Sequence, residues 1–384
     1  MIGSPLADAR EEAASRPAAA TSSLEADWPV ELGELPPPMC EPAVRGVLWW
    51  VHPQREGPKV EAIIEAMADV GMNLLWIIGS NAFLTQPDNP VLGRIFDEAD
   101  RRNWRVILAT SHNGGWYHDW DIPALKKLED RNIRAMADMY ARRPSFFGWY
   151  INYEIYMEWD AKSRLIRKLY NHIGRLTRAV TPGAKLTISP FFLADKDQIR
   201  ASFRYAEPDE YGAWWAETLT QAGIHIVMLQ DSSELHCACV PLATRVAFIR
   251  AMRDACRAAP DTELWGNVET VEIPAADMAD YARNIAQYRD TSNVGRWSFD
   301  MDRNAFKLDL ASRFTSNIVS WGWEFWNPVR PQTRVGDSRD NYAAYKAYYE
   351  SLDAIRISGS TGSSPQKAYH DRSSGHERQP NEAK

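Results

Sequence analysis

The chain has 384 residues, of which 45% are hydrophobic and 25% charged, and its formal net charge is −7. This composition is typical of a globular protein, and no apolar run approaches the ~18 residues that a membrane span requires. The negative charge argues against a nucleic-acid-binding surface, which needs clustered lysine and arginine. The basic segment 164–178 is better explained as the solvated face of an outer helix.

Short apolar runs, rich in branched or aromatic residues and flanked by polar segments, predict strands that are buried on both faces of a parallel sheet. In chain order these runs are 44–51, 72–78, 105–110, 146–151, 185–189, 225–230, 263–268 and 317–323. Segments with helical spacing lie between them, such as 59–70, 133–142, 162–180 and 243–259. Strands that alternate with helices indicate βαβ units, so we predict an α/β fold, a (β/α)8 TIM barrel over residues 41–356. The alternative, a doubly wound sheet, normally has a glycine-rich phosphate turn after its first strand, where this chain has VHPQREGP.

Both ends of the chain have the composition of disordered tails. Residues 1–40 are rich in Ala, Glu, Pro and Ser, and residues 357–384 are polar, so neither segment buries enough apolar surface to become ordered. The N-terminus shows no basic stretch followed by an apolar one, so a cytoplasmic protein is the default expectation, with secretion open if a signal was removed. The four cysteines match no disulfide framework and no standard zinc pattern, and we expect neither a metal nor a cofactor. The oligomeric state is left open.

Polar residues at strand ends indicate where the chemistry lies. In a TIM barrel the active site is at the C-terminal ends of the strands, and residues two apart share one face of a strand. Asn152 and Glu154 share a face at the end of the fourth strand, and Asn267 and Glu269 share one at the end of the seventh, with Trp265 below them. We expect these polar faces to point toward the barrel axis.

Two carboxylates that face one cavity are the minimum apparatus for glycosidic hydrolysis. One donates a proton to the leaving oxygen, and the other acts as nucleophile or activates water. Burial and mutual repulsion raise the pKa of one carboxyl and leave the other ionised. We predict that Glu154 is the general acid/base and Glu269 the nucleophile. The alternative for either is a carboxylate that holds a loop arginine or caps a helix.

The runs GWYINYEI, KLTISPFF, IVMLQDSSEL and GNVETVE carry a family resemblance. In order and spacing they resemble a glycosidase-like TIM-barrel family catalogued as a domain of unknown function, whose motifs read GWYI..E, SPFF, LQD and NVE. The resemblance covers residues 45–328 and includes the pattern of the large retaining-glycosidase clan, which implies Glu154 as acid/base and Glu269 as nucleophile. The chain departs from that pattern at Tyr153, because the clan places Asn directly before the acid/base and here Asn152 lies two residues back. A contact from this Asn to the sugar 2-hydroxyl is therefore in doubt.

The resemblance also singles out Gln230 and Asp231 at the end of the sixth strand and Glu324 after the eighth. Three roles are open for Asp231: it orients a substrate hydroxyl, serves as the acid, or holds the following loop. Glu324 is expected to share a strand face with Ser320 and Gly322, where it binds substrate hydroxyls or replaces one member of the glutamate pair.

Histidines and tryptophans near strand ends complete the predicted carbohydrate site. His52 and His112 follow the first and third strands, where each either binds sugar hydroxyls or has a structural role. The chain has 16 tryptophans, and Trp50, Trp116 and Trp326 are candidate stacking platforms for sugar rings, with core packing as the alternative. Trp116 lies in the polar, glycine-containing loop HNGGWYHDWD, which favours a position beside the cleft.

The leading hypothesis is a glycoside hydrolase of the retaining type that acts on an oligo- or polysaccharide. The alternative is a carbohydrate-binding TIM barrel without turnover. A Schiff-base aldolase needs an inward lysine near the C-terminal end of a strand, whereas Lys185 begins its strand. The long interval before the eighth strand, residues 280–302, predicts an extra helix and leaves room for an extra strand.

Overall fold

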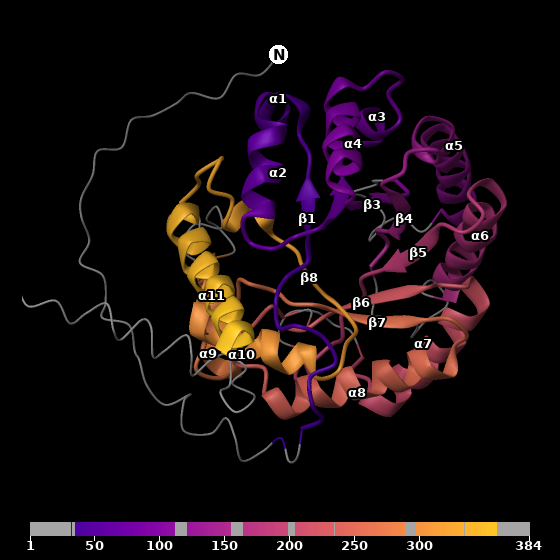
Figure 1. Ribbon diagram of the computed structural model, residues 1–384. Helices are drawn as coiled ribbons and strands as arrows, with labels where there is room; N and C mark the ends of the chain where they lie inside the picture. The colour runs from indigo at the N-terminus through magenta and orange to yellow at the C-terminus, as the bar shows by residue number, and fades with distance from the viewer. Residues whose placement is uncertain are drawn as a thin grey trace, which may run out of the picture.

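Eight parallel strands close into a single barrel in chain order, and helices surround it (Figure 1). The computed structural model describes residues 32, 35–111, 121–154, 164–198, 204–233, 235–288, 297–333 and 335–358. The predicted (β/α)8 TIM barrel is confirmed. Most of the two predicted tails lies outside the described residues.

Each strand falls within one of the predicted apolar runs. The strands are β1 (Gly46–Trp50), β2 (Leu74–Ile78), β3 (Arg105–Ala109), β4 (Phe146–Ile151), β5 (Lys185–Ile188), β6 (Ile226–Gln230), β7 (Glu263–Asn267) and β8 (Ile318–Ser320). β8 ends earlier than predicted because Gly322, with a φ of +82°, turns the chain into the 3-10 helix η2 (Trp323–Phe325). The prediction that Ser320, Gly322 and Glu324 share a strand face is therefore wrong.

The helices follow the predicted alternation. They are α1 (Pro53–Glu56), α2 (Val60–Ala68), α3 (Asn81–Leu84), α4 (Pro90–Arg102), α5 (Ile122–Tyr140), α6 (Arg164–Val180), α7 (Pro208–Ala222), α8 (Leu242–Ala258), α9 (Met278–Tyr288), α10 (Met301–Ser312) and α11 (Ser338–Ser358), with the 3-10 helix η1 (Gly57–Lys59) after α1. α4 shows the local signals clearly. The Asn89 side chain accepts hydrogen bonds from two backbone N–H groups of the first turn, Pro90 occupies the first helical position, and Asn103 ends the helix in a left-handed conformation.

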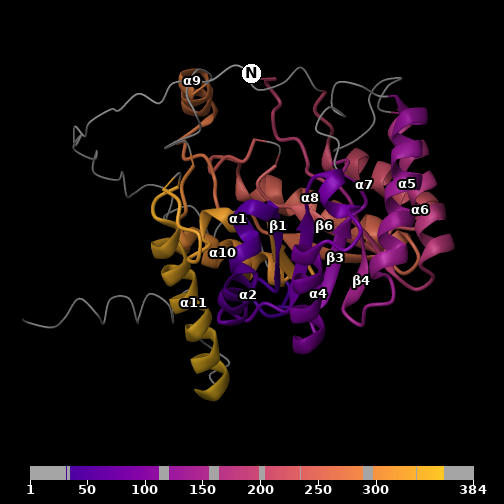
Figure 2. The same ribbon diagram turned by 90° about the horizontal axis from the view of Figure 1, so that it is seen from above.

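The connection between β7 and β8 carries the predicted extra helix, α9. Figure 2 shows α9 standing apart from the helices that surround the barrel. In place of an extra strand, the described part of this connection contains one isolated antiparallel bridge between Glu272 and Ser298. Among the described helices, none combines the length and the apolar character that crossing a membrane requires.

The segment 35–40 packs against the barrel, although its composition resembles that of the preceding tail. The backbone N–H of Met39 donates to the carbonyl oxygen of Ser312 at 2.7 Å, and Arg313 donates to the carbonyl oxygen of Pro36 at 3.1 Å. The folded unit therefore begins before residue 41.

The backbones of β4 and β5 approach each other closely at Gly148. A Cβ atom at this position would lie 2.1 Å from the carbonyl oxygen of Lys185. We expect Gly148→Ala to lower the free energy of unfolding by about 1–3 kcal/mol, because the two strands must move apart. Gly93→Ala in α4 is the matched control. Its added Cβ meets no atom within 4 Å, and a gain of about 0.5–1 kcal/mol is expected from the better helix former. Urea unfolding measures both changes, and equal effects would contradict the close approach.

Candidate active site

Glu154 follows β4 at the C-terminal mouth of the barrel, where its side chain is half-buried. One carboxylate oxygen accepts a hydrogen bond from the Gln230 side-chain amide at 3.0 Å, and the other accepts one from the Tyr150 hydroxyl. Burial and, to a smaller extent, the charge of Glu269 raise the pKa of Glu154 to about 7, against the opposing effects of Tyr150, Gln230 and His236. Neutral donors therefore hold this carboxyl group in a site that favours its protonated form.

Glu269 follows β7 and is fully buried. Its Oε1 accepts a hydrogen bond from the indole N–H of Trp321 at 2.6 Å and lies 2.7 Å from Nδ1 of His236. Its Oε2 has no hydrogen-bond partner among the described residues. Because the charge of Glu269 raises the pKa of Glu154, the two carboxyl groups belong to one electrostatic site.

His236, Trp297 and Trp321 form an aromatic wall beside Glu269. Their ring centroids are 5.4 to 5.9 Å apart, within the range of edge-to-face packing. None of the three was predicted as a site residue. The only sequence signal for His236 is its place beside two cysteines, and Trp321 had been assigned to a longer eighth strand.

A group of buried ionic side chains lies behind Glu269. We call Asp231, Arg245, Glu272, Arg303 and Lys307 the buried charge cluster. The ammonium nitrogen of Lys307 lies 3.2 Å from Asp231 and 3.3 Å from Glu272, and Arg245 lies 2.7 Å from Glu272. Arg303 also pairs with Glu272. Burial raises the pKa of Glu272, but the three cations outweigh that effect and hold it well below its usual value.

Two members of the buried charge cluster form hydrogen bonds with the backbone of Glu269. The N–H of Glu269 donates to Oδ1 of Asp231 at 2.8 Å, and the carbonyl oxygen of Glu269 accepts a hydrogen bond from Lys307. Since Oδ2 of Asp231 pairs with Lys307, both oxygens of Asp231 are engaged. Both contacts are structural, but the loop that Asp231 holds is the one after β7, which carries Glu269, and not the loop that follows Asp231 itself.

Asn152 and Asn267 are buried polar residues close to the two glutamates in sequence. Oδ1 of Asn152 has no partner in the part of the chain that the structure describes, and Asn267 donates to the Ser189 hydroxyl at 3.0 Å. Tyr153, which interrupts the expected motif, instead donates its hydroxyl proton to Glu129 on α5 at 2.6 Å. The extra residue in the motif thus packs toward a helix.

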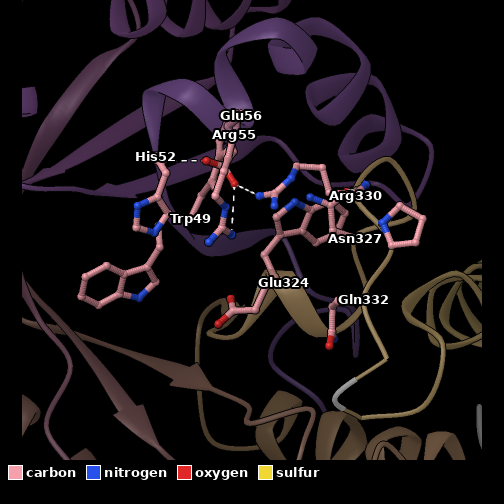
Figure 3. Close-up of a pocket in the computed structure, with 11 residues that line it drawn as sticks. Trp49, His52, Arg55, Glu56, Glu324, Asn327, Arg330 and Gln332 are labelled. Carbon is pink, nitrogen blue, oxygen red and sulfur yellow. Dashed lines mark hydrogen bonds and ion pairs between the residues drawn. The ribbon is translucent and has the colours of Figure 1, made fainter. Parts of the chain in front are cut away.

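Three further predicted residues line one pocket, shown in Figure 3. Trp50, His52 and Glu324 contribute to a cavity of about 460 Å³ at the C-terminal ends of β1 and β8, which we call the β1/β8 pocket. Trp326 does not line it. Its side chain is fully buried against Trp323 and Tyr345, so the prediction of Trp326 as a stacking platform is wrong. The predicted residues His112 and Trp116 lie outside the described residues.

The cysteines after β6 lie close together, with 2.7 Å between the sulfur atoms of Cys237 and Cys239. Both are free thiols. Among the described residues, no group of His, Cys, Asp and Glu side chains is arranged to hold a metal ion.

The family is decided by the match of residues 62–303 to the family model described as Domain of unknown function (DUF4434). The chain belongs to the DUF4434 family. This agrees with the resemblance to a barrel family of unknown function, while the motif-by-motif correspondence stays a prediction. A search of curated proteins found no match.

Solved structures share the fold of this DUF4434 chain. A proposed alpha-L-fucosidase from Bacteroides thetaiotaomicron is 16% identical, with a TM-score of 0.59, and the match covers 87% of this chain and 99% of that one. A beta-galactosidase from Marinomonas ef1 is 10% identical, with a TM-score of 0.51, over 84% of this chain and 61% of that one. At these identities the likeness shows the TIM-barrel fold alone.

The buried charge cluster makes the removal of one cation costly. Lys307→Met leaves Asp231 and Glu272 with less compensation, and we expect a loss of about 3–5 kcal/mol in the free energy of unfolding. Lys346→Met on α11 is the matched control, because Lys346 lies at the surface, 3.4 Å from Asp69, and we expect a loss below about 1 kcal/mol. Denaturant unfolding compares the two variants. Equal losses would show that the cluster does not stabilise the fold in this way.

Proposed function

We propose that the protein is a retaining glycoside hydrolase that acts on an oligo- or polysaccharide, with Glu154 as general acid/base and Glu269 as nucleophile. The observation that carries the proposal is the pair of carboxyl groups at the ends of β4 and β7, which interact electrostatically yet have contrasting surroundings. Both solved structures reported above are named as glycosidases, which supports the same reaction class.

In the first step the protonated Glu154 donates its proton to the glycosidic oxygen as the bond to the anomeric carbon breaks. Oε2 of Glu269 attacks that carbon from the opposite side and forms a glycosyl-enzyme. This oxygen suits the role because hydrogen bonds occupy Oε1 and leave the lone pairs of Oε2 unused among the described residues. In the second step Glu154, now a carboxylate, removes a proton from water, which attacks the anomeric carbon and releases Glu269.

The surrounding residues fit the same roles. Trp321 and His236 orient the carboxylate of Glu269, and Lys307 and Asp231 fix its backbone. Gln230 orients Glu154.

The second candidate is a carbohydrate-binding barrel without turnover. The complete burial of Glu269 favours it, because a nucleophile must be reached by the anomeric carbon. The displaced Asn152 favours it too, since Tyr153 separates this amide from Glu154. Turnover assays distinguish the two candidates, because both predict carbohydrate binding and only the first predicts sugar release.

Removing the proposed nucleophile should abolish turnover. On a panel of polysaccharides and aryl glycosides, we expect Glu269→Gln to lower kcat/KM by about 10³-fold or more. Glu263→Gln is the matched control, because Glu263 lies at the opposite end of the same strand, and it should keep the wild-type rate. Proton NMR of the first sugar released should show retained configuration. Inverted product, or undiminished release by Glu269→Gln, would refute the assignment.

The raised pKa of Glu154 predicts a basic limb in the activity profile. The acid must be protonated, so kcat/KM should fall as pH rises through about 7. In Glu154→Gln this limb should disappear, and aryl glycosides with good leaving groups should lose less rate than glycosides with poor ones, because they need less protonation. A variant that keeps the wild-type basic limb would exclude Glu154 as the acid.

The raised pKa of Glu154 also makes the stability of the folded protein depend on pH. The folded-state pKa of about 7 lies above the ordinary value of 4.5, so the folded protein binds the proton more tightly. The resulting stabilisation is fully present below pH 4.5 and is lost as pH rises through 7. Unfolding of the wild type and Glu154→Gln at several pH values should show a smaller decline for the variant across that window.

A further inference from the structure

The β1/β8 pocket contains two arginines that converge on one buried carboxylate. Glu56 at the end of α1 is 2% exposed. Its Oε2 accepts the backbone N–H of His52 at 2.7 Å. Its Oε1 accepts from Arg330 and, at 3.5 Å, from Arg55. One carboxylate oxygen therefore accepts hydrogen bonds from two guanidinium groups.

Most donors of these arginines are unused. A guanidinium group has five N–H donors, and within the described chain Arg55 and Arg330 donate only to Glu56. Arg55 is 52% exposed at its side chain and Arg330 25%. One arginine, Arg330, is enough to connect the loop before α11 to Glu56 of α1. The guanidinium group of Arg55 is not needed for that connection.

Two guanidinium groups lie close enough at this end of the pocket for the charge of one to act on the other. Burial lowers the pKa of Arg330 and the charge of Arg55 lowers it further. Burial and then the charges of Arg55 and Arg330 lower the pKa of His52 as well. Glu56 engages one donor of each arginine, and a second anion bound to their remaining donors would reduce their mutual repulsion further.

The loop that carries Arg330 is fixed before any ligand arrives. Oδ1 of Asn327 accepts the backbone N–H groups of Val329 at 3.0 Å and Arg330 at 3.3 Å. The Ser338 hydroxyl donates to the carbonyl oxygen of Asn327 at 3.0 Å. Binding therefore orders little of this loop, which favours affinity.

The segment after β8 contributes to both the pocket and the candidate active site. Trp321 donates to Glu269, and Trp323 and Glu324, two and three residues later, line the pocket. Trp50, at the end of β1, is 36% exposed, and an indole ring is suited to packing on the apolar face of a sugar. The cavity of about 460 Å³ lies within the size range of ligand sites.

We propose that the β1/β8 pocket is a subsite for a carboxylate-bearing sugar, a uronic acid residue of the substrate, whose carboxylate binds Arg55 and Arg330 and whose ring packs on Trp50. A planar carboxylate matches the paired N–H donors of a guanidinium group, which a neutral hydroxymethyl group does not. The inference rests on the proposed function, because it names the class of glycan that the hydrolase takes.

The test compares each acidic ligand with its own neutral counterpart. Glucuronate- and galacturonate-containing oligosaccharides and their carboxyl-reduced forms are titrated by calorimetry into the full chain carrying Glu269→Gln, so that binding is measured without turnover. We expect at least one acidic ligand to bind about 10-fold or more tightly than its reduced form, with a preference that declines as salt increases. Sulfated oligosaccharides and inorganic sulfate are titrated in parallel, and tighter binding of a sulfated ligand would overturn the assignment to a carboxylate.

Variants then assign the preference to the arginines. Arg55→Gln and Arg330→Lys should each reduce the preference for the acidic ligand and leave affinity for its reduced form unchanged. Arg330→Lys retains a charge for Glu56 and so protects the fold. Arg101→Gln, which removes an exposed arginine paired with Glu98 on α4, is the control and should keep the full preference.

Each outcome separates this inference from the proposed function. Equal binding of acidic and reduced ligands, no binding of either, or a preference that survives both pocket variants would overturn the subsite. Sugar release from neutral glycans alone by the wild type would overturn it too and leave the hydrolase standing. A preference that depends on Arg55 and Arg330, without any turnover by the wild type, would support the subsite and overturn the hydrolase.

Discussion

The candidate site depends on the buried ammonium group of Lys307. This side chain is 2% exposed, pairs with Asp231 and Glu272, and donates to the carbonyl oxygen of Glu269. A buried charge is tolerated only when its partners are complete, since each ion gives up its hydration. The cluster has three cations and two carboxylates, and the charge of Glu269 also acts on Asp231 and Arg245. The chain after β7 is thus held by interactions that cannot loosen one at a time without leaving a charge unpaired.

The two glutamates differ because their neighbours differ in charge. Tyr150 and Gln230 offer neutral donors to Glu154, so its pKa stays raised despite both hydrogen bonds. Glu269 instead lies in front of a cluster with surplus positive charge and beside His236. Paired-carboxylate sites separate the acid from the nucleophile by differences of this kind in the surroundings of the two groups. The assignment of roles follows from these surroundings more than from strand position.

The sequence predicted what depends on local patterns. Apolar runs and helical spacing were sufficient for the barrel, and strand order placed Glu154 and Glu269 at its mouth. The buried charge cluster was not predictable in this way, because a lysine or arginine on a helix normally indicates a solvated face. Burial of Lys307 requires partners after β6 and β7 that only the closed barrel brings together. Trp326 was mispredicted for a similar reason, since its exposure depends on Tyr345 of α11.

Gly322 links catalysis and substrate choice in these proposals. Its left-handed conformation, with a φ of +82°, connects Trp321, which contacts Glu269, to Trp323, which lines the β1/β8 pocket. A residue with a Cβ atom is strained in this conformation, and the added atom would also lie 2.8 Å from the Phe325 ring. The turn at Gly322 therefore sets the positions of both Trp321, the hydrogen-bond donor to Glu269, and Trp323 in the pocket wall.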